Sequence, residues 1–172
     1  QAPPAEIAIY VQMDFERFLL TWDLVKDRTG RALEIGANPY FTTVLLREFS
    51  DLDLTLTNSF GSSDSPTASQ HVSYRSSTRH GVDVATDLDF HLLNVETERF
   101  PFGDGQFSTV LFCEVIEHLF VDPVAALIEI NRVLADNGVL AVSTPNAARL
   151  ENLAPIAAGA NLYDPHSGNG PY

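Results

Sequence analysis

The feature that most constrains the fold is a regular alternation of short apolar runs with segments of helical pattern. Short continuous apolar runs are typical of strands that are buried on both faces of a parallel sheet. Helices between such strands supply the crossover connections that parallel pairing needs. The sequence therefore predicts an α/β fold with a doubly wound, mostly parallel sheet and helices on both faces. Strands are expected at residues 31–35, 52–57, 90–95, 109–113 and 139–143.

Capping residues indicate where the helices begin. Asp14 is a candidate N-cap, and residues 1–13 before it are expected to form a loose entry. Asp122 and Pro123 pair an N-cap with a proline at the first helical position. Residues 59–88 are polar, without a clear helical period, so a loop or an irregular hairpin is expected there. The predicted helices span residues 14–28, 40–49 and 123–135.

The loop after the first strand limits which ligand this sheet binds. Ligands of doubly wound sheets bind outside the carboxyl ends of the strands, where Gly36 follows the first strand. A dinucleotide site uses the pattern G-x-G-x-x-G, but Asn38 and Phe41 stand at the second and third glycine positions. The only lysine, Lys26, belongs neither to a P-loop nor to a Tyr-x-x-x-Lys pair. A cofactor without phosphates is therefore favoured over a dinucleotide or a nucleoside triphosphate.

Polar residues stand at the first strand and at the ends of the next two. They are Glu34, Asn58 and Asn94. S-adenosylmethionine (SAM) carries a cationic sulfonium, a ribose with two hydroxyls and an adenine with a polar edge. One acidic and two amide side chains suit these groups, so SAM, with S-adenosylhomocysteine as its product, is a candidate cofactor.

A series of motifs then resembles one family. The chain resembles class I SAM-dependent methyltransferases of the type 11/12 group. The resemblance begins with residues 34–39 (Glu-Ile-Gly-Ala-Asn-Pro) and continues in order through residues 94–107, 110–119, 122–123, 129–134, 137–138 and 143–146. The resemblance covers residues 31–146 and implies a Rossmann-like fold, of which the usual C-terminal hairpin is not visible in this chain. It implies that Glu34, Gly36, Ala37 and Asn38 line the methionine and ribose end of SAM. Asn58 would face the ribose hydroxyls, where relatives usually carry Asp or Glu, and Asn94 and Val95 would frame the adenine edge. Cys113 and Glu114 would lie where the fourth strand meets the cofactor and the acceptor.

The same resemblance implies methyl transfer to a small-molecule or sugar- or polysaccharide-type acceptor, and we expect the acceptor atom to be oxygen. A hydroxyl acceptor benefits from a general base, for which Glu117 and His118 are the candidates, with Glu114 nearby. His118 suits this role near neutral pH, but capping or packing at a helix start and metal binding are alternative roles. No metal site is assigned, and Cys113 is interpreted as a core thiol without a catalytic role.

We expect one domain in three parts. Residues 1–30 form an N-terminal helical segment, residues 31–146 the SAM-binding core, and residues 147–172 an acceptor-side loop region. Tyr163, His166 and Tyr172 of the last part are candidate substrate contacts.

Charge and cysteine content bear on partners and location. The formal net charge is −13, which disfavours a nucleic acid partner. No apolar run is long enough for a transmembrane helix, and no secretion signal is visible. A single cysteine fits a reducing compartment, so a cytoplasmic location is expected. The alternative function is a catalytically inactive methyltransferase-like domain that binds SAM or a partner.

Overall fold

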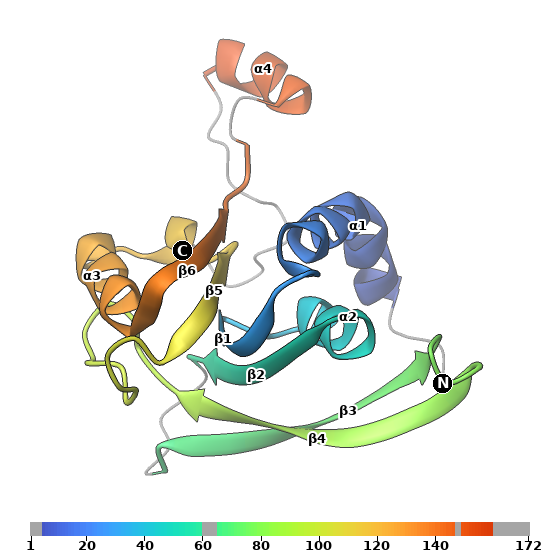
Figure 1. The fold of residues 1–172 in the computed structure, drawn as a ribbon. Helices are drawn as coiled ribbons and strands as arrows, with labels where there is room; N and C mark the ends of the chain where they lie inside the picture. The colour runs from blue at the N-terminus through green and yellow to red at the C-terminus, as the bar shows by residue number, and fades with distance from the viewer. Residues whose placement is uncertain (1–4, 60–64, 147–148, 160–172) are drawn as a thin grey trace.

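The structure is a computed structural model, and it describes residues 5–59, 65–146 and 149–159. Its centre is one six-stranded sheet with the strand order β3-β4-β2-β1-β5-β6 (Figure 1). Neighbouring strands pair in parallel, except for the antiparallel pair β3 and β4. In chain order the elements are α1 (Ala5–Val25), β1 (Thr29–Ile35), α2 (Phe41–Phe49), β2 (Asp51–Asn58), β3 (Thr67–Ser76), β4 (Val82–Leu92), β5 (Phe107–Cys113), the short 3-10 helix η1 (Ile116–His118), α3 (Pro123–Val133), β6 (Leu134–Ser143) and α4 (Leu150–Ala157).

Both faces of the sheet are covered, as the sequence predicts. Successive residues of β1, Ala32 and Leu33, point to opposite faces, and both are fully buried. Ala32 belongs to a core cluster with Leu46 of α2, whereas Leu33 belongs to one with Ile130 of α3. Figure 1 shows α1 and α2 on one side of the sheet and α3 on the other. The prediction of a doubly wound α/β sheet is confirmed.

The strand register brings the ends of the parallel strands together. Ile35 at the end of β1 pairs with Thr57 of β2 and with Phe112 of β5. We call the edge where β1, β2, β4, β5 and β6 end the carboxyl edge, and the opposite edge the amino edge. The chain leaves β1 through α2 toward one side and leaves β5 through α3 toward the other. The switch point therefore lies between β1 and β5, where such folds bind ligands.

The polar stretch 59–88 contains a regular hairpin in its described part. β3 and β4 pair residue for residue from Thr67↔His91 to Ser76↔Val82. On the outer face His71 contacts Asp87 at 2.8 Å, and such polar pairs obscure the alternation of apolar residues in the sequence. Because β3 runs antiparallel to β4, it returns the chain to the amino edge and takes the place of a crossover helix. The tip is tied to α2, since Tyr74, Ser76 and Thr78 all donate hydrogen bonds to the Glu48 carboxylate.

Several predicted boundaries are wrong. The strand expected at 90–95 ends at Leu92, because Asn94 opens a turn in which its Oδ1 accepts the N–H of Glu96 (3.0 Å). The third helix ends at Val133 instead of Ala135, and β6 begins at Leu134. Asn137, expected to separate this helix from the last strand, has φ 62° and lies within β6, next to a register irregularity.

The two ends of the described chain are more helical than expected. α1 begins at Ala5, so Asp14 lies inside the helix and is not its N-cap. The added turns are held by Tyr10, whose ring lies 5.9 Å from that of Phe41 at the start of α2. Within the stretch expected to be a loop, Leu150–Ala157 form α4, which projects away from the sheet (Figure 1). In the described residues, no helix is long and apolar enough to span a bilayer.

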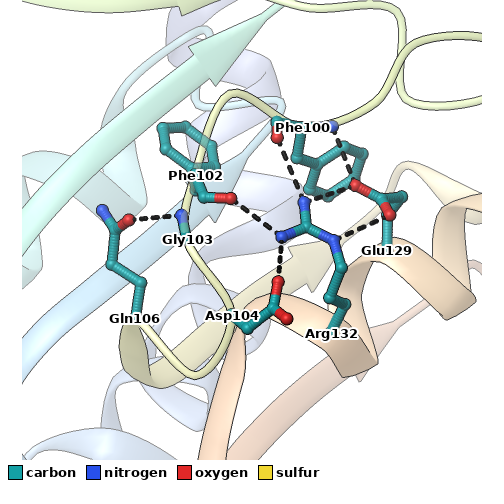
Figure 2. Close-up of polar contacts among 7 residues, drawn as sticks. All are labelled: Phe100, Phe102, Gly103, Asp104, Gln106, Glu129 and Arg132. Atoms are coloured by element: carbon teal, nitrogen blue, oxygen red, sulfur yellow. Dashed lines mark hydrogen bonds and ion pairs between the residues drawn. The ribbon is translucent and has the colours of Figure 1, made fainter.

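The turn before β5 is fastened to α3 by Arg132 (Figure 2). The Arg132 guanidinium donates five hydrogen bonds, to both carboxylate oxygens of Glu129, to the carbonyls of Phe100 and Phe102, and to Asp104. Glu129 in turn accepts the N–H of Phe100 (2.9 Å). The hydrogen bonds from Arg132 lower the pKa of Glu129 and those carboxylates raise the pKa of Arg132, so both groups stay charged. This network fixes the amino edge of the sheet on the α3 side.

Candidate functional site

The loop at the end of β1 is shaped by Gly36. Its φ is +71°, and a Cβ at this position would lie 2.7 Å from Val115 Cγ2. Both the backbone and the available space therefore require glycine. The N–H groups of Gly36 and Ala37 donate to the Thr57 carbonyl (3.0 and 3.1 Å). Gly36 and Asn38 are exposed at the carboxyl edge, whereas Ala37 is buried.

Asn58, at the end of β2, is turned toward this loop. Its side chain is buried, and its Oδ1 accepts the N–H of Asn38 (2.9 Å). Its Nδ2 donates to the Tyr40 hydroxyl (3.0 Å), which donates to Gln70 of β3 (3.1 Å). Both ends of the amide thus have protein partners. In this arrangement Asn58 holds the β1–α2 loop in shape.

Glu34 lies beneath the loop in the layer between the sheet and α2. Its carboxylate is buried, and Thr43 of α2 donates a hydrogen bond to its Oε2 (2.7 Å). Burial raises the pKa of Glu34 from its ordinary value of 4.5 to about 7, and the Thr43 bond opposes this only in part. Glu34 therefore joins β1 to α2 beneath the loop.

Asn94 and Val95 lie in the turn after β4. The carbonyl of Asn94 accepts the N–H groups of Thr97 and Glu98, and the Asn94 side chain is exposed. Glu98 accepts the Asn94 N–H (2.5 Å) and so closes the turn. Val95 is half-buried against the core cluster on the α3 side. A hollow of about 310 Å³ opens beside this turn, lined by residues 95–99 with Ala125 and Glu129 of α3.

Cys113 and Glu114 end β5 in different environments. Cys113 packs in the core cluster beneath α1, and its Sγ approaches the Ala141 carbonyl at 3.8 Å. Burial raises the pKa of this thiol. Glu114 has φ 55°, a left-handed conformation that is uncommon for a non-glycine residue. Its Oε1 accepts a hydrogen bond from Ser143 Oγ at the end of β6 (2.7 Å), which holds the carboxylate at the carboxyl edge.

Three residues of α1, none of them among the predicted site residues, form a polar cluster in which Arg17 contacts Glu114. Arg17 Nε lies 3.9 Å from Glu114 Oε2 and donates to Asp14 Oδ1 (3.1 Å). Arg17 Nη2 donates to the Tyr10 hydroxyl (2.9 Å). We call Tyr10, Asp14, Arg17 and Glu114 the α1 cluster. The only sequence signal for this cluster is the spacing of residues 10, 14 and 17, which lie on one helical face. The predicted helix began at Asp14 and therefore left Tyr10 outside this pattern.

Glu117 and His118 follow β5 on the short helix η1. The Glu117 carboxylate is half-buried, and burial raises its pKa. Thr144 Oγ1 donates to it at 3.4 Å, and His118 Nε2 lies 3.9 Å away. The His118 side chain is more exposed than that of Glu117, 45% against 21%. The structure thus places both predicted catalytic residues together at the carboxyl edge.

The predicted substrate contacts and the metal alternative complete the comparison with the sequence predictions. Tyr163, His166 and Tyr172 lie outside the described residues. Across residues 5–59, 65–146 and 149–159 there is no group of three or more His, Cys, Asp or Glu side chains that could hold a metal ion.

The family follows from sequence comparison. Residues 33–142 match the model of the methyltransferase domain family, which is more than half of the chain. The chain belongs to this family. No curated protein matches the sequence of this methyltransferase domain.

The fold is shared with the first two of three similar solved structures. A crystal structure of a putative SAM-dependent methyltransferase from Methanococcus maripaludis is 13% identical, with a TM-score of 0.53 over 90% of this chain and 67% of that one. The [4+2]-cyclase SpnF is 17% identical, with a TM-score of 0.50 over 74% and 43%. A putative methyltransferase in complex with the Haloferax volcanii activator Trm112 is 18% identical, with a TM-score of 0.49 over 75% and 53%. This methyltransferase domain thus spans between 43% and 67% of these chains.

SAM is the cofactor of this family, and the residues of the carboxyl edge fit it unevenly. Its amino-acid end carries a carboxylate and an ammonium group, and the α1 cluster offers a guanidinium and two carboxylates beside the Gly36 loop. The exposed Asn94 amide suits the polar edge of adenine. Asn58 fits the ribose less well, because its amide already has protein partners at both ends.

Proposed function

We propose that this domain transfers the methyl group of SAM to an oxygen atom of a small-molecule or saccharide acceptor. The family match over residues 33–142 supports methyl transfer. The observation that favours oxygen is the pair Glu117 and His118 at the carboxyl edge. Both residues come shortly after Val115, which packs against Gly36. A hydroxyl acceptor gains from such a base, whereas a thiolate or a neutral amine needs one less.

Bound SAM supplies an electrophilic methyl group. The chain's own task is to align the acceptor with it and to exclude water. Because burial raises its pKa, Glu117 is a stronger base than an exposed carboxylate. We assign to Glu117 the acceptance of the hydroxyl proton and to His118, 3.9 Å away, its transfer to solvent. Glu34, Gly36, Ala37 and Asn38 hold the cofactor's methionine and ribose end in this proposal, directly or by shaping the loop.

The acceptor class rests on charge. With a net charge of −13, the domain attracts nucleic acid poorly, so a small molecule or a saccharide is the better candidate. A cytoplasmic location stays a prediction from the single, half-buried cysteine.

The second candidate is a domain that binds SAM or a partner without turnover. It is favoured by Asn58, which stands where an acidic ribose ligand is usual and which bonds to the protein's own loop. In addition, one protein of the same fold is named as a [4+2]-cyclase, so the fold alone does not imply methyl transfer.

The deciding experiment is a calorimetric titration with SAM of the wild type and the Gly36→Arg variant. We expect saturable binding by the wild type and its loss in the variant, because the side chain would fill the loop against Val115. Gly81→Arg is the matched control. Gly81 has φ +77°, close to the +71° of Gly36, but lies in the hairpin turn with nothing within 4 Å of its Cβ position. Both variants therefore carry similar backbone strain.

Turnover then separates the two candidates. The wild type is incubated with SAM and hydroxylated acceptors, and S-adenosylhomocysteine is measured, with Glu117→Gln as the test of the base. Product formed by the wild type and strongly reduced in Glu117→Gln supports the oxygen-directed enzyme. Binding of SAM without product across the acceptors favours the inactive domain. A folded wild type that does not bind SAM at all contradicts the enzyme and leaves, of the second candidate, only a domain that binds a partner.

A further inference from the structure

Arg17 sits in a half-buried position at the carboxyl edge. Its side chain is 20% exposed, and its Nε lies 3.9 Å from Oε2 of Glu114, the residue that follows β5 at this edge. Two ring contacts support this placement. The ring centroid of Phe41, the first residue of α2, lies 5.5 Å from that of Phe18 and 5.9 Å from that of Tyr10. The α1 cluster therefore borders the loop.

The other side of the cluster also touches the loop. Glu114 lies 3.9 Å from Arg17 and is followed by Val115, the residue that packs against Gly36. Glu114 keeps its left-handed backbone conformation where the sheet ends, and such conformations are often retained at functional sites. Arg17 and Glu114 thus lie next to each other, and Glu114 is joined to the residue that packs against Gly36.

The charges of the cluster are mixed and incompletely used. The hydrogen bonds of Arg17 engage Nε with Asp14 and Nη2 with Tyr10. Toward residues 5–59, 65–146 and 149–159 its Nη1 makes no hydrogen bond, and the contact with Glu114 is a longer ion pair. One Glu114 oxygen is held by Ser143, and the other faces the guanidinium. A ligand with one carboxylate and one ammonium group would complete both partners.

From this arrangement we infer that Arg17 binds the α-carboxylate of the amino-acid end of SAM, and that Glu114 binds its α-ammonium group. The inference rests on the proposed cofactor. It makes α1 part of the cofactor site, with Asp14 and Tyr10 as positioning residues that orient the guanidinium. Guanidinium groups pair with carboxylates through two parallel hydrogen bonds, which an amide cannot reproduce.

The test compares two ligands on the whole protein by calorimetry. SAM carries the α-carboxylate, whereas decarboxylated SAM lacks it and retains the sulfonium and the amino group. We expect Arg17→Gln to weaken SAM binding by about 10- to 100-fold, as for loss of a charge-assisted hydrogen bond, and to change decarboxylated SAM binding less than about 2-fold. Arg17→Lys should recover part of the SAM affinity. Glu114→Gln should weaken both ligands, because both carry the amino group.

Arg28→Gln is the matched control. Arg28 is also half-buried, but it bonds to Thr109 and Ser108 at the amino edge. It should change neither affinity. Equal weakening of both ligands by Arg17→Gln would show a role in folding of the site and would overturn the inference, as would unchanged binding of both. A wild type that binds neither ligand would instead overturn the proposed function, and the inference with it.

Discussion

Two arginines at opposite edges of the sheet are equally enclosed but differently used. The side chains of Arg132 and Arg17 are 17% and 20% exposed. Arg132 donates five hydrogen bonds, all to the protein itself, and thereby joins α3 to the turn before β5 (Figure 2). Arg17 donates two, to Asp14 and Tyr10, and has a longer contact with Glu114.

The difference shows how one residue type serves structure and binding. A guanidinium has five N–H donors in a rigid fork, and Arg132 uses all of them, so it has nothing to offer a ligand. Arg17 is held in place by Asp14, Tyr10 and the Phe18 ring, and its Nη1 donates no hydrogen bond to the described residues. Burial alone does not distinguish the two roles; the count of satisfied donors does.

The largest effect is expected for Arg132→Gln. This change removes five hydrogen bonds and leaves the Glu129 carboxylate and two carbonyls short of a donor, so we expect a loss of about 3–4 kcal/mol in the free energy of unfolding. Chemical denaturation measures it. Arg17→Gln removes only two hydrogen bonds and should cost about 1–2 kcal/mol. Equal losses for the two variants would contradict the contrast between the two edges.

Glu34→Gln tests the buried carboxyl beneath the loop. Well below pH 4.5 Glu34 is protonated in the folded and the unfolded chain, so folding buries no charge at this site. Between pH 4.5 and about 7 the unfolded chain releases the proton and the folded chain keeps it, so stability falls as the pH rises. Above pH 7 the full cost is present, and we expect Glu34→Gln to be more stable than the wild type by about 2–3 kcal/mol.

The measurement is the free energy of unfolding of both proteins from pH 4 to pH 8. The two curves should meet at the acidic end and separate as the pH rises. Glu16→Gln, at an exposed glutamate of α1, is the control and should follow the wild type throughout. A constant difference between Glu34→Gln and the wild type at all pH values would show that no proton is exchanged at this site.

A smaller effect is expected for Asn58→Ala. The variant loses the bonds from the Asn38 N–H and to the Tyr40 hydroxyl, which should cost about 1–2 kcal/mol of stability. If Asn58 acts on SAM by shaping the loop, Tyr40→Phe, which removes only the partner hydroxyl, should weaken SAM binding in the same direction. Weaker binding by Asn58→Ala with an unchanged Tyr40→Phe variant would instead indicate direct contact with the ribose. Calorimetry on both variants distinguishes the two roles.

The sequence predicted the central sheet well because its signals are local. Buried apolar runs and the capping pair Asp122 and Pro123 identify β1, β5 and α3 without knowledge of distant contacts. The hairpin β3–β4 was harder, because His71 and Asp87 make its outer face polar and only its inner face packs. The α1 cluster was missed for another reason: Arg17 and Glu114 are 97 positions apart, and no spacing rule connects them.

A third arginine gives the smallest effect and completes the comparison. Arg75 donates one hydrogen bond to Asp83 across the hairpin (3.0 Å), with both side chains more than 70% exposed. An exposed pair is screened by solvent and by salt, and neither partner loses hydration when the pair is broken. Arg75→Gln should therefore leave both the melting temperature and the SAM affinity unchanged within error. A clear loss of stability would instead show that this pair contributes to folding despite its exposure, and that exposure does not separate it from Arg132.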